Sequence, residues 1–180
     1  VADRIKVECS DDVYDLIPNK DDFLPPNNPQ NSYIWSRCLT KMRNKMISDC
    51  NVRICAGGRQ FDYRGILPCI LEEIVSIIEK EQPVYLLFGF VGVTSSVCKL
   101  IQTKDIPEEL TLKWQKKTSS NYEGLLAYTA KRNPENLVDY ENIAQIILKA
   151  DLNNGLCDDD NYRLFNTTYI DEAVYLIFKG

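Results

Sequence analysis

The fold of this chain depends on one stretch, CAGGRQFDYRGILPCILEE, which occupies residues 55–73. It follows an apolar run and contains three glycines (Gly57, Gly58 and Gly65), an arginine inside the turn and two glutamates at its end. A strand that only turned a corner would need a single glycine. Pro68 suits the first turn of a helix, because its missing N–H would have no partner there. The stretch therefore predicts a strand, a glycine-rich loop and a helix.

A second strand with glycines at its end follows in YLLFGFVGVTSS, residues 85–96. Its apolar run ends at Gly89 and Gly92, and three hydroxyl side chains then stand where the next helix should start. Strands that alternate with helices are typical of parallel sheets. We therefore expect an α/β fold with a doubly wound, mainly parallel sheet that carries helices on both faces.

The remaining segments are assigned from their periodicity and from the residues that break it. Residues 105–137 are polar and irregular and allow one short helix. An apolar stripe predicts a helix over residues 33–47, and its members are Trp35, Leu39, Met42 and Met46. We also predict a strand at residues 4–9, a loop rich in proline and asparagine at 15–32, and helices at 138–150, 158–167 and 170–179.

Length and composition predict one globular domain over residues 1–180, with 44% hydrophobic and 26% charged residues. The chain begins at Val1 without methionine and stops at Gly180 after an apolar stretch, so we expect a domain taken from a longer protein. A net charge of −5 and a pI near 4.9 argue against nucleic acid as a partner. No apolar run approaches the length of a membrane span.

Histidine and cysteine usage narrows the possible chemistry. The chain has no histidine, which excludes Ser-His-Asp and Cys-His catalysis and most catalytic zinc sites, so we expect no metal. Its seven cysteines are odd in number and contain no CxxC pair. We therefore expect reduced thiols and a cytoplasmic protein.

The loop after the first strand has the composition of an anion site. Gly57 and Gly58 leave consecutive backbone N–H groups unobstructed, and Arg59 can form two bonds to a phosphate or a carboxylate. Gly65 allows another close approach of the backbone. The helix that starts near Pro68 directs its positive end toward the same place. These features predict binding of an anion.

Two acids, Glu72 and Glu73, lie about one turn into that helix. They would repel a phosphate but accept hydrogen bonds from ribose hydroxyls, so the combination fits a nucleotide. The same residues also have a purely structural explanation. Glycines are common in tight turns, acids stabilise a helix N-terminus, and Arg59 can simply be solvated. The residues alone leave both interpretations open.

The loop after the second strand favours the nucleotide interpretation, because neighbouring strands bring their loops together. Gly89 and Gly92 flank Phe90, which can stack on a base, whereas Phe88 is better explained as core. Arg43, on the preceding helix, is either a second phosphate anchor or part of a solvated helix face.

Three runs, LTKMRNKM, VRICAGGRQFDYRGILPCILEE and PVYLLFGFVG, together resemble the SLOG superfamily of Rossmann-like domains. More narrowly, they resemble the bacterial defence-associated branch found beside TIR and SIR2 domains. That branch shows a methionine-arginine pair on a helix, GG followed by a basic residue, G-x-x-P-G-I-x-E-E and a glycine-rich strand end. The resemblance covers residues 34–100, and residues 140–180 more loosely.

Such domains are similar to sensors in Thoeris-type anti-phage systems, where a TIR enzyme makes a cyclic ADP-ribose signal and the SLOG domain switches on an attached effector. The resemblance implies that Arg43 and Arg59 hold phosphates and that Glu73, with Glu72, holds the ribose. It also implies a floor of glycines, namely Gly57, Gly58, Gly89 and Gly92. Cys69 stands where the family usually has glycine, and FGFVG replaces the more usual GGFGG.

The leading hypothesis is a non-catalytic sensor that needs no cofactor, binds an ADP-ribose-type nucleotide, regulates a TIR-like or SIR2-like effector and forms a homo-oligomer. The alternative is a nucleotide N-glycosidase (phosphoribohydrolase) or deoxyribosyltransferase-like enzyme, in which Glu73 would stabilise an oxocarbenium-like sugar. The threonine of the phosphoribohydrolase loop is absent, and Leu67 and Pro68 take its neighbourhood. A third hypothesis is an assembly module with a vestigial pocket and an interface on the apolar C-terminal helix.

Overall fold

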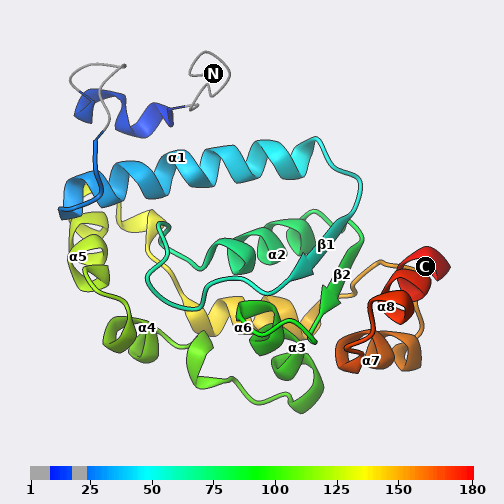
Figure 1. Cartoon of the computed structure of the whole chain (residues 1–180). Helices are drawn as coiled ribbons and strands as arrows, with labels where there is room; N and C mark the ends of the chain where they lie inside the picture. Colours follow the sequence, from blue (N-terminus) through cyan, green and yellow to red (C-terminus); the bar gives the residue numbers. More distant parts are fainter. Residues whose placement is uncertain (1–8, 18–23) are drawn as a thin grey trace.

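The computed structural model describes residues 9–17 and 24–180, which form a mainly helical α/β fold around a short parallel sheet (Figure 1). The predicted strand at residues 4–9 lies, except for Cys9, outside the described residues. The elements are the strands β1 (Arg53–Ala56) and β2 (Val84–Leu87), the helices α1 (Pro29–Ser48), α2 (Cys69–Glu79), α3 (Val93–Thr103), α4 (Leu112–Thr118), α5 (Tyr122–Arg132), α6 (Tyr140–Lys149), α7 (Asp158–Asn166) and α8 (Ile170–Lys179), and the short 3-10 helices η2 (Asp11–Leu16), η3 (Glu108–Leu110) and η4 (Pro134–Asn136).

β1 and β2 pair in parallel, from Arg53 opposite Val84 to Ala56 opposite Leu87. α2 connects them, so residues 55–73 form the strand end, the loop and the helix start of a βαβ unit, as predicted. In the part of the chain that the structure describes, the sheet has these two strands alone. The α/β class is therefore confirmed, whereas a doubly wound sheet would require further strands.

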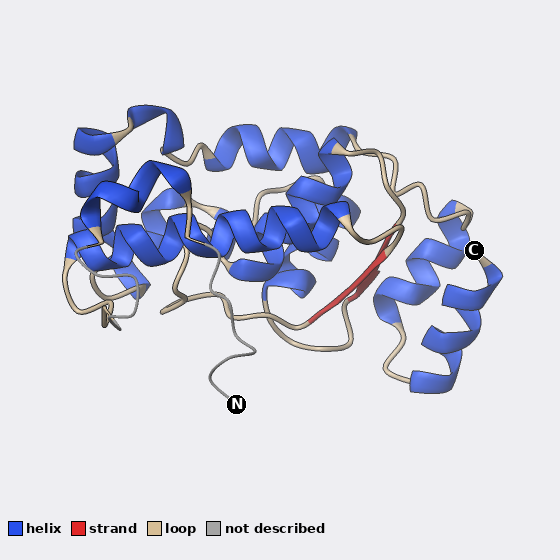
Figure 2. Cartoon of the chain, turned by 90° about the horizontal axis from the view of Figure 1, so that it is seen from above, coloured by secondary structure: helices blue, strands red, loops and turns tan. Residues whose placement is uncertain are grey.

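Helices cover both faces of β2. Because side chains alternate along a strand, Val84 and Leu86 point to one face and Tyr85 points to the other. Val84 and Leu86 belong to the main hydrophobic core, together with residues of α2, α3 and α6. Tyr85 packs in a separate cluster with Leu164 of α7 and Leu176 of α8. Figure 2 shows α7 and α8 as a pair beside the strands.

The predicted helix before β1 is confirmed as α1, but its buried face differs from the apolar stripe in the sequence. The Asn28 side chain caps it by accepting from the N–H of Asn31 at 2.9 Å, and Pro29 occupies its first position. Met42 and Met46 of the stripe are 42% and 40% exposed. The buried residues of α1 are Tyr33, Ile34, Ser36, Cys38, Arg43 and Ile47. This face meets α2 and α5, so tertiary contacts set the rotation of the helix.

Residues 105–137 are more helical than the sequence predicted. α4 and α5 both form there, and Tyr122, Leu125 and Thr129 of α5 are buried. Tyr122 and Leu125 share a hydrophobic cluster with Tyr33 and Ile34 of α1. A short polar helix is marginal in water, and the burial of one face against a neighbour stabilises it. Because the segment is polar overall, its sequence did not indicate the buried face of α5.

The predicted helices near the C-terminus are confirmed as α6, α7 and α8. α6 begins after Asp139, whose side chain accepts from the N–H groups of Glu141 and Asn142, both at 3.0 Å. None of the helices within residues 9–17 and 24–180 has both the length and the apolar character needed to cross a membrane.

Candidate functional site

The loops that follow β1 and β2 touch each other at the carboxyl end of the parallel pair. The N–H of Val93 donates to the carbonyl of Gly58 at 3.0 Å, and the N–H of Thr94 donates to the carbonyl of Gly57 at 2.9 Å. These bonds join the first turn of α3 to the loop after β1. The expected proximity of the two glycine-rich loops is thus observed, at the edge where parallel sheets of α/β proteins bind ligands.

Three glycines of these loops have positive φ angles, which are +66° at Gly57, +94° at Gly58 and +134° at Gly92. A Cβ at Gly92 would lie 2.3 Å from the carbonyl oxygen of Gly58, and a Cβ at Gly58 would lie 2.8 Å from side-chain carbons of Ile70 and Val93. These glycines therefore allow the two loops to pack against each other and against α2. The N–H groups of α3 that face them are already bonded within the protein.

Two other predicted glycines lie apart from this contact. Gly89 approaches the turn between α7 and α8, where its Cβ would lie 2.5 Å from the carbonyl oxygen of Thr167. Gly65 is buried, and its Cβ would lie 2.8 Å from the carbonyl oxygen of Leu67 and 3.5 Å from Nη1 of Arg43. Gly89 thus lies against the turn between α7 and α8, and Gly65 lies beside the guanidinium of Arg43.

The charged residues predicted to hold a ligand form a buried network of ion pairs between α1, α2 and β1. The Arg43 guanidinium donates to Glu72 and its Nε lies 4.0 Å from Oε1 of Glu73, while Glu73 also pairs with Arg53. Arg43 is 3% exposed, and Glu72 and Glu73 are each 7% exposed. The structure therefore brings the three predicted residues together, but their charges face one another. Because each buried charge has a partner, the network suits a structural role.

Sequence reasoning missed two members of this network. Arg53 pairs with Glu73, and the hydroxyl of Thr40 donates to Glu72. Alternate residues of a strand share a face, so the apolar character of Cys55 could have indicated that Arg53 also points toward α2. Thr40 lies three residues before Arg43 on α1, on the same side of the helix.

Arg59 differs from Arg43 in being exposed. Its guanidinium forms no hydrogen bond or ion pair with another residue in the part of the chain that the structure covers. On the neighbouring loop, Phe90 is 46% exposed. The hydroxyl of Thr94, at the start of α3, is fully buried and has no hydrogen-bond partner among the described residues. An exposed guanidinium and an exposed ring can contact a phosphate and a base, respectively.

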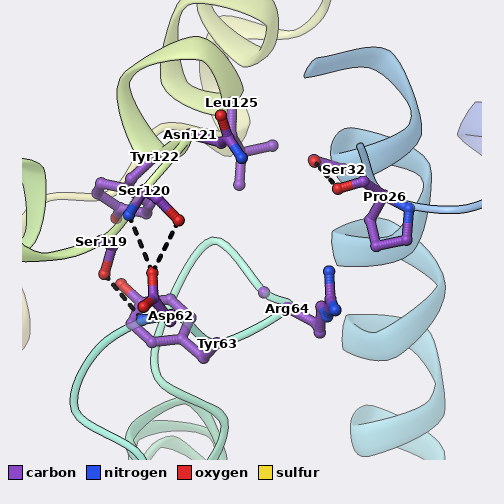
Figure 3. A pocket seen from close by; sticks show the side chains of 11 residues that line it. Pro26, Ser32, Asp62, Tyr63, Arg64, Ser119, Ser120, Asn121, Tyr122 and Leu125 are labelled. Atoms are coloured by element: carbon purple, nitrogen blue, oxygen red, sulfur yellow. Dashed lines mark hydrogen bonds between the residues drawn. The ribbon is translucent and has the colours of Figure 1, made fainter. Parts of the chain in front are cut away.

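A cavity of about 170 Å³ lies farther along the loop after β1 (Figure 3). It is bounded by residues 62–65, by the start of α1 and by the junction of α4 with α5. Of its lining residues, Gly65 was predicted as a site residue and Arg64 was not. A signal for Arg64 was present, since it is the second arginine in the same glycine-rich stretch as Arg59.

Comparison with known proteins places the chain in a family. Neither the curated proteins nor the solved structures contain a significant match. A family model, described as SLOG cluster2, matches residues 1–164, which is most of the chain. This match indicates a nucleotide-related domain and agrees with the α/β fold and with the paired glycine-rich loops at the ends of its strands. The chain belongs to the SLOG cluster2 family.

Proposed function

We propose that this chain is a nucleotide-binding sensor domain whose ligand is an ADP-ribose-type molecule, linear or cyclic. The observation that supports it is the contact of the two glycine-rich loops at the carboxyl end of β1 and β2, with Arg59 exposed and unpaired in the described chain. A guanidinium forms two parallel bonds to a phosphate, and a ring such as Phe90 stacks on a base. Membership of the SLOG cluster2 family supports the same class of ligand.

In this proposal, the residues of the two touching loops contact the ligand directly. Arg59 and the backbone N–H groups of Gly57 and Gly58 hold the diphosphate, and Phe90 stacks on the base. Gly92 allows the loops to approach each other closely, because any side chain at this position would collide with the Gly58 carbonyl.

The remaining predicted residues act by positioning these loops. Arg43, Glu72 and Glu73 fix α1 against the start of α2, to which the first loop leads. Gly65 lies within that loop beside Arg43, and Gly89 joins the second loop to the turn between α7 and α8. We therefore propose an indirect role for these five residues in ligand binding.

Calorimetric titration with cyclic ADP-ribose isomers, ADP-ribose and NAD tests the proposal. At least one of these compounds should bind, and Arg59→Ala should weaken its binding by about 10- to 100-fold, because a charged hydrogen bond is lost. Lys149→Ala removes an exposed cation on α6 and is the matched control. Absence of heat across the whole panel would remove the sensor proposal.

The enzymatic alternative depends on Glu73, and its surroundings do not favour it. The Glu73 carboxylate is bonded to Arg53 and is 7% exposed, so it is not directed at a sugar bound from solvent. We therefore propose binding without catalysis. A base-release assay on AMP and related nucleotides tests this point, and turnover that Glu73→Gln abolishes would establish an enzyme instead.

The proposal includes a biological setting. We propose that residues 1–180 are one domain with a doubly wound sheet, that the domain needs no cofactor, and that it acts as a homo-oligomer on a TIR-like or SIR2-like effector in anti-phage defence in the cytoplasm. All seven cysteines are free thiols, which supports a reducing compartment. Light scattering with and without ADP-ribose tests the oligomer, and phage challenge of cells that carry Arg59→Ala in the full-length protein tests the role in defence.

A further inference from the structure

The cavity beside residues 62–65 has a cationic side and an acidic, hydroxylated side (Figure 3). Arg64 lies on the side of α1. Asp62, Ser119 and Ser120 lie on the opposite side, where α4 ends and α5 begins. A ligand that fills this cavity would therefore meet a guanidinium at one end and a carboxylate at the other.

The carboxylate of Asp62 is held in place through one of its two oxygens, as far as the described residues show. The Asp62 N–H donates to the Ser119 hydroxyl at 3.1 Å. The N–H and the hydroxyl of Ser120 both donate to Oδ1 of Asp62, at 2.9 and 3.0 Å. Its other oxygen, Oδ2, accepts from no residue in the described ranges. A fixed carboxylate with an available oxygen is a preorganised acceptor for hydroxyl groups of a ligand.

The cationic side of the cavity is formed by Arg64. The Arg64 guanidinium forms no hydrogen bond or ion pair with any residue at positions 9–17 or 24–180. Asn121 lines the cavity at the start of α5, and its side chain does not cap that helix. The first turn of α5 lies across the cavity from Arg64, on the same side as Asp62. The cavity therefore offers donors to an anion as well as an acceptor to hydroxyl groups.

The size of the cavity limits the ligand. Its volume of about 170 Å³ lies below the roughly 300–1,000 Å³ typical of sites for drug-sized ligands. It suits a phosphate with one sugar better than a complete dinucleotide. We propose that this cavity binds a sugar phosphate, with the phosphate at Arg64 and the sugar hydroxyls at Asp62. The source is either a free pentose phosphate or the terminal ribose phosphate of a larger nucleotide.

This site goes beyond the proposed function, because it uses neither Arg59 nor the contact between the two glycine-rich loops. It can therefore be tested separately, by calorimetry and ligand-observed NMR with ribose 5-phosphate, ribose and inorganic phosphate. Ribose 5-phosphate should bind more tightly than either fragment. Arg64→Ala should weaken its binding at least about tenfold, because the charged hydrogen bonds to the phosphate are lost.

Asp62→Asn provides a second variant that keeps the local structure. Asparagine tolerates the left-handed backbone at this position, where φ is +50°, and keeps the Oδ1 acceptor for Ser120. It replaces the available carboxylate oxygen by an N–H donor, so binding of ribose 5-phosphate should weaken. Lys149→Ala, which lies outside the cavity, should have no effect. Thermal unfolding of each variant shows whether lost binding reflects a lost fold.

Weaker binding of ribose 5-phosphate in both Arg64→Ala and Asp62→Asn supports the proposal. The proposal is overturned if inorganic phosphate binds as tightly as ribose 5-phosphate, or if Arg64→Ala leaves the binding of ribose 5-phosphate unchanged. Arg59→Ala distinguishes this site from the proposed function, since it should weaken nucleotide binding and leave ribose 5-phosphate binding unchanged. Competition between ADP-ribose and ribose 5-phosphate in the wild-type protein identifies the nucleotide as the source, and simultaneous binding identifies a free sugar phosphate.

Discussion

Arg43 on α1 and Glu72 on α2 form a buried ion pair that joins the helix before β1 to the helix after it. The Thr40 hydroxyl donates to the same glutamate, and Glu73 pairs with Arg53 on β1. An unpaired charge in this environment would cost several kcal/mol, so the members of the network depend on one another. Arg43, Glu72 and Glu73, which the family resemblance assigns to ligand binding, thus hold together the elements on either side of the loop between β1 and α2.

Replacement of Arg43 alone should destabilise the protein strongly. Arg43→Met leaves Glu72 buried without its cation, and breaking a buried pair costs about 3–5 kcal/mol. The double variant Arg43→Met, Glu72→Leu removes both charges and should recover most of that loss. Urea denaturation measures both effects as changes in the free energy of unfolding. A single variant within about 0.5 kcal/mol of the wild type would contradict the buried pair.

Alanine should be far less tolerated at Gly92 than at Gly57. The backbone of Gly92, with φ +134° and ψ −163°, lies in a region used almost only by glycine, and its Cβ would collide with the Gly58 carbonyl. Gly92→Ala should cost about 3 kcal/mol or more. At Gly57 the nearest atom to a Cβ is the Val91 carbonyl oxygen, at 3.5 Å, so Gly57→Ala should cost only the left-handed strain of about 1–2 kcal/mol. Thermal unfolding of the two variants provides the comparison, and equal melting temperatures would contradict the packed loops.

The attachment of α8 should weaken in acid. A hydrogen bond from Lys179 holds the pKa of Asp160 on α7 below its usual value. A carboxyl whose pKa is lower in the folded state stabilises the fold above its unfolded pKa of about 3.9, and this contribution is lost as pH falls through the folded pKa. The protection of the α8 amides, which is the exchange rate divided by the intrinsic rate at the same pH, should therefore decrease below about pH 4 and stay constant between about pH 5 and 8. Asp160→Asn should exchange faster at neutral pH and lose this acid response.

Thiol reactivity should follow burial. Cys157 is exposed, whereas Cys55 is 1% exposed and burial raises its pKa to about 12. At pH 8 only about one Cys55 thiol in ten thousand would be ionised, and the thiolate is the reactive form. Iodoacetamide labelling followed by mass spectrometry should modify Cys157 first and Cys55 only after unfolding. Early labelling of Cys55 would show that the strand opens readily.

The order of elements from β1 to α3 could be predicted because its signals are local. The apolar run around Cys55 indicated the strand, Gly57 and Gly58 indicated the loop, and Pro68 indicated the helix start, each from a few neighbouring residues. Residues 105–137 were predicted to allow one short helix, and the sequence did not indicate that both α4 and α5 form there or that one face of α5 is buried. The stability of α5 comes from burial against α1, which lies far away in the sequence, and no local pattern records that contact.

The sequence also identified residue types without identifying their partners. It placed Arg43, Glu72 and Arg59 among the candidates because guanidinium and carboxylate groups suit a nucleotide. Local composition and spacing were sufficient for the α/β class and for the two glycine-rich strand ends, whereas the SLOG family was indicated by the resemblance of three runs to that superfamily. Tertiary packing alone decided that Arg43 and Glu72, 29 residues apart, would neutralise each other, while Arg59 and Arg64 would stay unpaired within the described chain. The physical reason is that burial determines which charges must be paired, and burial depends on contacts between distant segments.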